Sequence, residues 1–128
     1  MNQYGKGKLF VLTVPDNFTD LYEYPEPTLN AMRSYLMGDF PVRIEAPAKV
    51  SLFAYDKGAF IVESFRDQPV DVTILLPAGS ALTNLVTGNR LTELPSAKGP
   101  EETANAPRLS AYGVKVQPHS YQVFTTKK

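Results

Sequence analysis

Proline and glycine interrupt this sequence at short intervals, and they limit how far any regular element can run. The 128 residues include 11 prolines and 8 glycines. Proline is excluded from central strands and helix interiors, and both residue types mark turns. We therefore expect short strands joined by turns. The length fits one domain, and a hydrophobic content of 43% is sufficient for a full core.

Apolar and polar residues alternate in the segments that follow Pro41, which is the pattern of strands with one buried face. Residues 49–55 and 59–65 form the clearest hairpin, because the sequence between them, Asp56-Lys57-Gly58, is typical of a turn. Further strands are predicted at residues 70–76, 81–86, 90–94, 109–112, 114–117 and 121–126, with a long polar loop at 95–107. Strands separated by turns at intervals of about 8 to 12 residues indicate an antiparallel β-sandwich.

The N-terminal part of the chain follows a different pattern. Residues 8–14 are an apolar run that ends at Pro15, and they predict a buried strand. Pro27 suits the first turn of a helix, and apolar side chains recur at helical spacing from there to Leu36. Gly38 is a natural helix stop.

The change of period at Pro41 divides the chain into two parts. The predicted fold class is mainly β: an antiparallel β-sandwich over residues 41–128, with one N-terminal strand–helix (βα) unit over residues 1–40.

Composition excludes several function classes. Lys plus Arg and Asp plus Glu both total 13, and this zero net charge argues against a nucleic-acid-binding protein. The chain has no cysteine, which removes disulfides, thiolate metal sites and thiol catalysis. No apolar run approaches the roughly 20 residues that span a bilayer, so no membrane span is expected.

Residues that could carry catalysis are few. His119 is the only histidine, and it could pair with Ser120 or Ser110. A catalytic triad also needs a third group that holds the histidine, and the sequence pattern indicates none. Carboxylate pairs that could hydrolyse a glycoside are available only as residues equally suited to a helix start or a solvated strand face: Asp20, Glu23, Glu26, Glu63 and Asp67. We therefore expect no catalytic set, no metal site and no cofactor in this chain.

Tyrosines offer a candidate binding surface. The chain has seven tyrosines and no tryptophan. Aromatic rings with polar edges form platforms for sugars. Four tyrosines are predicted at loops or strand ends and are the candidate glycan platform: Tyr22, Tyr24, Tyr55 and Tyr112. The alternative interpretation is that these rings pack at the rim of the sandwich, with their hydroxyls in water.

Several segments resemble a known arrangement of domains. Residues 4–15, followed by Asp20-Leu21-Tyr22 and Arg33, resemble the last strand and helix of an amidotransferase-like α/β domain. Such a domain occurs in multidomain bacterial glycoside-hydrolase-like and β-galactosidase-like proteins, where a small β-sandwich closes the chain. Residues 85–91 and 116–124 are similar to segments of that closing sandwich.

The resemblance implies that this chain has a function other than catalysis. It makes the chain a non-catalytic accessory domain of a larger carbohydrate-processing protein, whose partners are the upstream domains of the same polypeptide. It favours a periplasmic or secreted location. Two alternatives stay open: a carbohydrate-binding module that uses the surface tyrosines, and a small stand-alone hydrolase.

Overall fold

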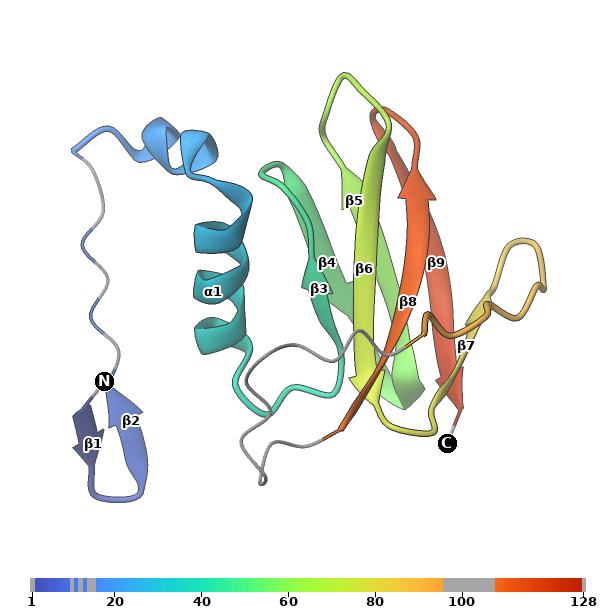
Figure 1. The fold of residues 1–128 in the computed structure, drawn as a ribbon, viewed down its shortest axis with the longest axis horizontal. Helices are drawn as coiled ribbons and strands as arrows, with labels where there is room; N and C mark the ends of the chain where they lie inside the picture. Colours follow the sequence, from blue (N-terminus) through green and yellow to red (C-terminus); the bar gives the residue numbers. More distant parts are fainter. Residues whose placement is uncertain (1, 10, 12, 14–15, 96–107, 128) are drawn as a thin grey trace.

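Two antiparallel sheets pack face to face in the computed structural model, which describes residues 2–9, 11, 13, 16–95 and 108–127 (Figure 1). One sheet has the strand order β3-β6-β8 and the other has the order β4-β5-β9-β7. The strands of the first sheet are β3 (Arg43–Glu45), β6 (Val70–Pro77) and β8 (Leu109–Val116). Those of the second are β4 (Val50–Ala54), β5 (Ala59–Ser64), β7 (Ala81–Asn84) and β9 (Ser120–Lys127). The predicted antiparallel β-sandwich is confirmed.

The core lies between the two sheets and follows the alternation in the sequence. Along β6, Val70, Val72, Ile74 and Leu76 are buried while the residues between them are more exposed. In the other sheet Phe60 of β5 lies directly opposite Phe124 of β9. Their rings stack with centroids 5.4 Å apart, and both side chains are fully buried. Each strand thus contributes every second side chain to one apolar layer, as its pleat requires.

The N-terminal segment differs from its prediction. A hairpin forms from β1 (Asn2–Tyr4) and β2 (Gly7–Leu9), where a single buried strand over residues 8–14 was expected. Gly5 adopts a φ of 57° in the connecting turn, a left-handed conformation that favours glycine and permits tight hairpins. Leu9 is half exposed and Val11 is 83% exposed, so the prediction of a buried strand is wrong.

Two helical elements lead from the hairpin to the sandwich. The 3-10 helix η1 (Phe18–Glu23) begins after Asn17, whose side chain accepts a hydrogen bond from the backbone of Thr19. The α-helix α1 (Glu26–Met37) confirms the predicted helix, with a proline in its first turn and its end at Gly38. Figure 1 shows α1 beside β3 and β4, the edge strands of the two sheets. The helix therefore covers one open side of the sandwich.

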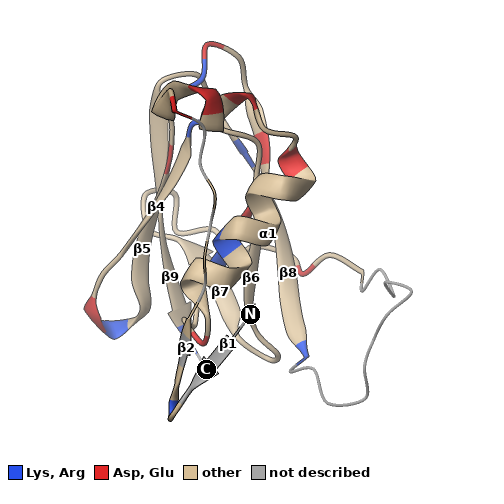
Figure 2. Ribbon diagram, turned by 90° about the vertical axis from the view of Figure 1, so that its left-hand side faces the viewer, with Lys and Arg blue, Asp and Glu red and all other residues tan. Residues whose placement is uncertain are grey.

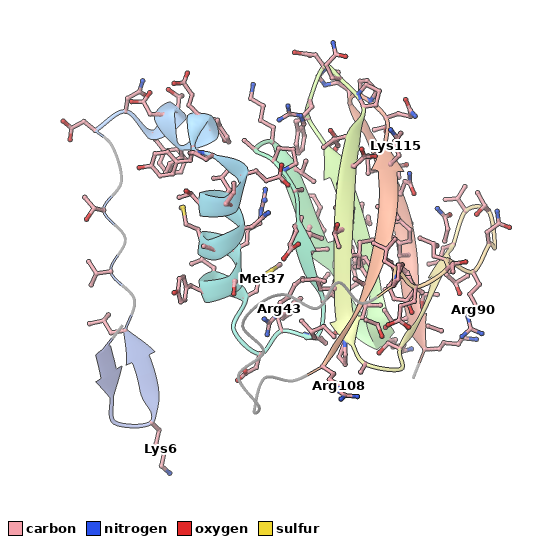
Figure 3. All side chains as sticks on the ribbon, viewed as in Figure 1. Lys6, Met37, Arg43, Arg90, Arg108 and Lys115 are labelled. Atoms are coloured by element: carbon pink, nitrogen blue, oxygen red, sulfur yellow. The ribbon has the colours of Figure 1, made fainter. Side chains whose placement is uncertain are left out.

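Arg43 of β3 fastens the C-terminal end of α1. Its guanidinium donates from Nη2 to the carbonyl oxygen of Gly38 (2.5 Å), and Figure 3 shows Arg43 below the last turn of the helix, near Met37. A cation at a helix C-terminus also interacts favourably with the helix dipole.

The turn between β4 and β5 gives a matched test of local packing. It contains the short 3-10 element η2 (Asp56–Gly58). Gly58 has a φ of 76°, and a Cβ built there would lie 2.5 Å from Oγ1 of Thr126. Gly79 has a similar φ of 80°, but open space surrounds its Cα.

We expect Gly58→Ala (G58A) to destabilise the domain more than Gly79→Ala (G79A). Both variants carry the cost of a left-handed alanine, about 1 kcal/mol. G58A carries in addition the displacement of Thr126, about 1–2 kcal/mol. Urea denaturation of both variants measures the difference in unfolding free energy. Equal losses would show that the η2 turn does not pack on β9 as described.

Candidate functional site

A short segment that crosses from one sheet to the other is held by side chains rather than by strand pairing. Residues 46–49 connect β3 to β4, and Lys49 within them has a φ of 63°. Backbone groups in such a crossover lack a ladder partner and need hydrogen bonds from elsewhere.

Arg33 of α1 supplies most of these bonds. Its guanidinium donates to the carbonyl oxygens of Ala46, of Pro47 (2.9 Å) and of Val50 (3.4 Å). Asn30, one helical turn earlier, accepts from Arg33 Nη1 (2.8 Å) and from the backbone N–H of Ala46 (3.0 Å). We call this set of contacts the arginine clamp. It binds the helix to the crossover through both ends of a rigid guanidinium fork.

The clamp is partly shielded from water. Burial lowers the pKa of Arg33, and the negative charge of Glu26 opposes that shift. Arg66, which follows β5, satisfies a further carbonyl of the crossover by donating from Nη1 to Ala48 (3.0 Å). The crossover is thus held by arginines from two different elements.

Two adjoining cavities lie along this crossover. The larger, of about 650 Å³, separates η1 and α1 from the start of β4 and has mainly apolar walls, among them Leu21, Leu29, Met32, Val50 and Phe65. The smaller, of about 260 Å³, has Lys49, Arg66, Asp67 and Gln68 in its wall. Tyr22, Ala48 and Lys49 line both cavities. One groove therefore has an apolar part and a polar part, with the Tyr22 ring where they meet.

His119 lies next to the polar part. It occupies the turn between β8 and β9 with a φ of 48°, and its Nε2 is 2.7 Å from Oδ1 of Asp67. The hydroxyl of Ser120 donates to the carbonyl oxygen of Gln117 (2.8 Å), and Ser110 is buried, where it accepts from the backbone N–H of Gly79 (3.3 Å). Neither serine is hydrogen-bonded to His119, because each is bonded to a backbone group instead.

Comparison with known proteins identifies the sandwich. A family profile described as "probable glycosyl hydrolase, C-terminal domain" matches residues 41–126. The chain belongs to this family. No curated protein and no solved structure gives a match. A C-terminal domain follows other domains in its polypeptide, so the family implies further domains in the same protein.

The matched region of this glycosyl hydrolase C-terminal domain begins with β3 and extends into β9. It therefore includes both sheets, the crossover and the residues of the polar cavity other than Tyr22. The hairpin, η1 and α1 precede it.

The structure does not bring the four candidate tyrosines of this domain together. Tyr22 is half exposed on η1, and Tyr24, just after η1, is partly buried. Tyr55 is 61% exposed but follows the far end of β4, whereas Tyr22 lies beside the residues that precede this strand. The proposed platform is therefore divided between separate places.

Tyr112 was predicted at a strand end, and this placement is wrong. The residue lies inside β8, is only 4% exposed, and its hydroxyl donates to the carbonyl oxygen of Ser80 (2.5 Å). Burial raises the pKa of Tyr112, with a further contribution from Glu93 and an opposing one from Arg90. A ring enclosed by the core cannot present a face to a sugar.

The candidate carboxylates belong to several different elements. Asp20, Glu23 and Glu26 are exposed on η1 and at the start of α1, while Glu63 is on β5 opposite Tyr121. Within the described ranges no three His, Cys, Asp or Glu side chains are grouped so as to hold a metal ion. Of the helices in the described part of the chain, none is long and apolar enough to cross a membrane.

Proposed function

We propose that this chain is a non-catalytic accessory domain of a larger carbohydrate-processing protein, and that it packs against the preceding domains of the same polypeptide. The family description supports the setting, because it names a C-terminal domain of a probable glycosyl hydrolase. Both candidate serines are hydrogen-bonded to backbone groups rather than to His119, which supports a non-catalytic role. The amidotransferase-like origin of residues 1–40 stays a prediction.

The observation that carries the proposal is the exposed apolar surface of the N-terminal elements. Val11 is 83% exposed and Leu36 is 79% exposed, while Leu9 and Phe18 are also largely accessible. No residue of α1 is fully buried. Large apolar side chains left this exposed on neighbouring elements are typical of surfaces that another protein domain covers.

The charge pattern of α1 supports the same conclusion. Its charged residues are Glu26 at the start and Arg33, as Figure 2 shows on the ribbon. Arg33 is directed into the clamp, so its charge does not serve the outer surface. A helix that faces water over one side normally carries charges there. Thr28, Ala31 and Tyr35 are exposed on α1 instead, and such a face suits contact with another protein domain.

We expect Leu36→Lys (L36K) to weaken docking of the preceding domains. A lysine there would place a charge in a contact that excludes water. Val86→Lys (V86K) is the matched control, because Val86 is 76% exposed and lies beyond β7, far along the chain from α1. Both variants would be made in a polypeptide that carries the preceding domains.

Hydrogen exchange and thermal denaturation of the two variants measure the effect. L36K should expose α1 to exchange and lower the melting temperature of the multidomain protein, whereas V86K should leave both unchanged. In the isolated 128-residue chain L36K should be neutral. The proposal fails if L36K and V86K behave alike in the multidomain protein, or if the isolated chain hydrolyses glycosides.

A further inference from the structure

The polar cavity beside the crossover has features of a small binding site. Four polar side chains line it, and the half-exposed ring of Tyr22 forms part of its wall. We call it the Tyr22 pocket, and its polar residues are Lys49, Arg66, Asp67 and Gln68.

Segments far apart in the sequence build this pocket. Tyr22 comes from η1, Lys49 from the crossover between the sheets, and the other three polar residues from the connection between β5 and β6. The turn between β8 and β9 adds His119, which contacts Asp67. A groove whose wall is assembled from three segments by tertiary packing is a common arrangement for ligand sites.

Hydrogen bonds hold parts of the wall in place. Arg66 is tied to the crossover through Ala48 (3.0 Å), and its own carbonyl oxygen accepts from the backbone N–H of His119 (3.2 Å). Lys49 and His119 both have positive φ values, 63° and 48°, a conformation that is unfavourable for residues with a Cβ. Such conformations persist where the surrounding structure imposes them, and they are concentrated at functional sites.

Other groups of the wall are free to bind a ligand. Neither the Lys49 ammonium nor the Gln68 amide is hydrogen-bonded to another residue in the described part of the chain. Asp67 uses Oδ1 toward His119, which leaves Oδ2 as an acceptor. The pocket thus offers a cationic donor, an amide that both donates and accepts, and a carboxylate acceptor, all beside an aromatic face.

We propose that the Tyr22 pocket binds a neutral pyranose residue of a glycan. A pyranose has an apolar C–H face for the Tyr22 ring and hydroxyls that donate to Asp67 and accept from Lys49. An anion would meet the Asp67 carboxylate, and a cation would meet Lys49 and Arg66, so neither uses the whole set. The pocket is open and its acid is mostly exposed, so we expect a millimolar affinity.

This inference does not depend on docking to preceding domains. The test is an NMR titration of the isolated chain with methyl glycosides of neutral hexoses, followed through backbone amide shifts. Methyl glucuronide serves as the anionic comparison. Saturable shifts should centre on Lys49 and on residues 66–68, and the glucuronide should bind less well than the neutral sugars.

Variants locate the site. Tyr22→Ala (Y22A) should weaken binding by about tenfold through loss of the stacking surface. Tyr55→Ala (Y55A) removes a similarly exposed ring at the far end of β4 and should change nothing. Gln68→Ala (Q68A) removes an exposed side chain without a structural hydrogen bond, so it tests the pocket even if Y22A disturbs η1.

The expected result is weaker binding by Y22A and Q68A with unchanged binding by Y55A. The inference is overturned if no neutral sugar produces saturable shifts, if only the glucuronide does, or if the shifts persist unchanged in both Y22A and Q68A. None of these outcomes affects the comparison of L36K with V86K, so the two proposals fail separately.

Discussion

Replacing Phe124 with alanine (F124A) is expected to lower the unfolding free energy of the domain by about 3–5 kcal/mol. Phe124 is fully buried in β9, which is paired on both sides, with β5 and with β7. Its ring stacks on Phe60 at a centroid distance of 5.4 Å. Alanine would leave a cavity in the centre of the sandwich and remove the partner of Phe60. Domains of this kind are stable by about 5–15 kcal/mol, so the loss is a large share of the total.

Urea denaturation followed by circular dichroism measures this loss. Tyr121→Ala (Y121A) is the matched control, because Tyr121 is on the same strand with its side chain 61% exposed. Its replacement should cost less than about 1 kcal/mol. Phe124→Leu (F124L) retains more of the volume and should fall between the two. Similar losses for F124A and Y121A would contradict the assignment of inward and outward faces of β9.

The sandwich could be predicted because its strands obey the two-residue period closely. In β6, Val70, Val72, Ile74 and Leu76 are the buried residues, as the alternation predicted. The turn at Asp56-Lys57-Gly58 likewise joins β4 to β5. Both signals are local, since a strand's inward positions follow from its own sequence.

The errors in predicting the sandwich strands arise where a residue type such as glycine occurs both in turns and inside strands. The sequence predicts separate strands at residues 109–112 and 114–117, on either side of Gly113, but β8 runs without a break from Leu109 to Val116. A Cβ on Gly113 would lie 3.6 Å from Leu94, so this side chain lies over the bare strand. The misplacement of Tyr112 follows from the same error. Residues 90–94 were predicted as a strand, and the structure has only an isolated bridge from Arg90 to Thr83.

Contacts that depend on tertiary packing could not be predicted, because they produce no pattern in the sequence. β3 is only three residues long and was not predicted, although Ile44 within it is buried. The arginine clamp joins residues 13 to 17 positions apart, and its acceptors are backbone carbonyls. Every residue has such a carbonyl, so the sequence cannot mark which ones an arginine will meet. The Tyr22 pocket was missed for the same reason, because its wall combines three segments that are far apart in the sequence.

Replacing Arg33 with methionine (R33M) is expected to release α1 from the sandwich. Methionine keeps much of the apolar stem but removes every hydrogen bond that Arg33 makes to the crossover. The carbonyl oxygens of Ala46 and Pro47 would then lose their donor at the partly buried contact between helix and sheet. Hydrogen bonds to a charged group contribute about 1.5–3 kcal/mol each. Because Arg33 is only half-buried and water can replace part of the set, we expect a total loss of about 2–3 kcal/mol.

The loss should be local, and hydrogen exchange distinguishes it from global unfolding. Amides of α1 should exchange much faster in R33M, while those of β5, β6 and β9 remain protected, because their pairing does not involve the clamp. Arg43→Met (R43M) is the matched control, since Arg43 makes a single hydrogen bond to the end of the same helix and should lose less than about 1 kcal/mol. Arg33→Lys keeps the charge without the fork and should resemble R33M more than the native protein. If R33M and R43M accelerate exchange in α1 equally, the clamp is not what holds the helix. In the multidomain protein, R33M should also weaken docking, because the apolar face of α1 can meet its partner only while the helix is held in place.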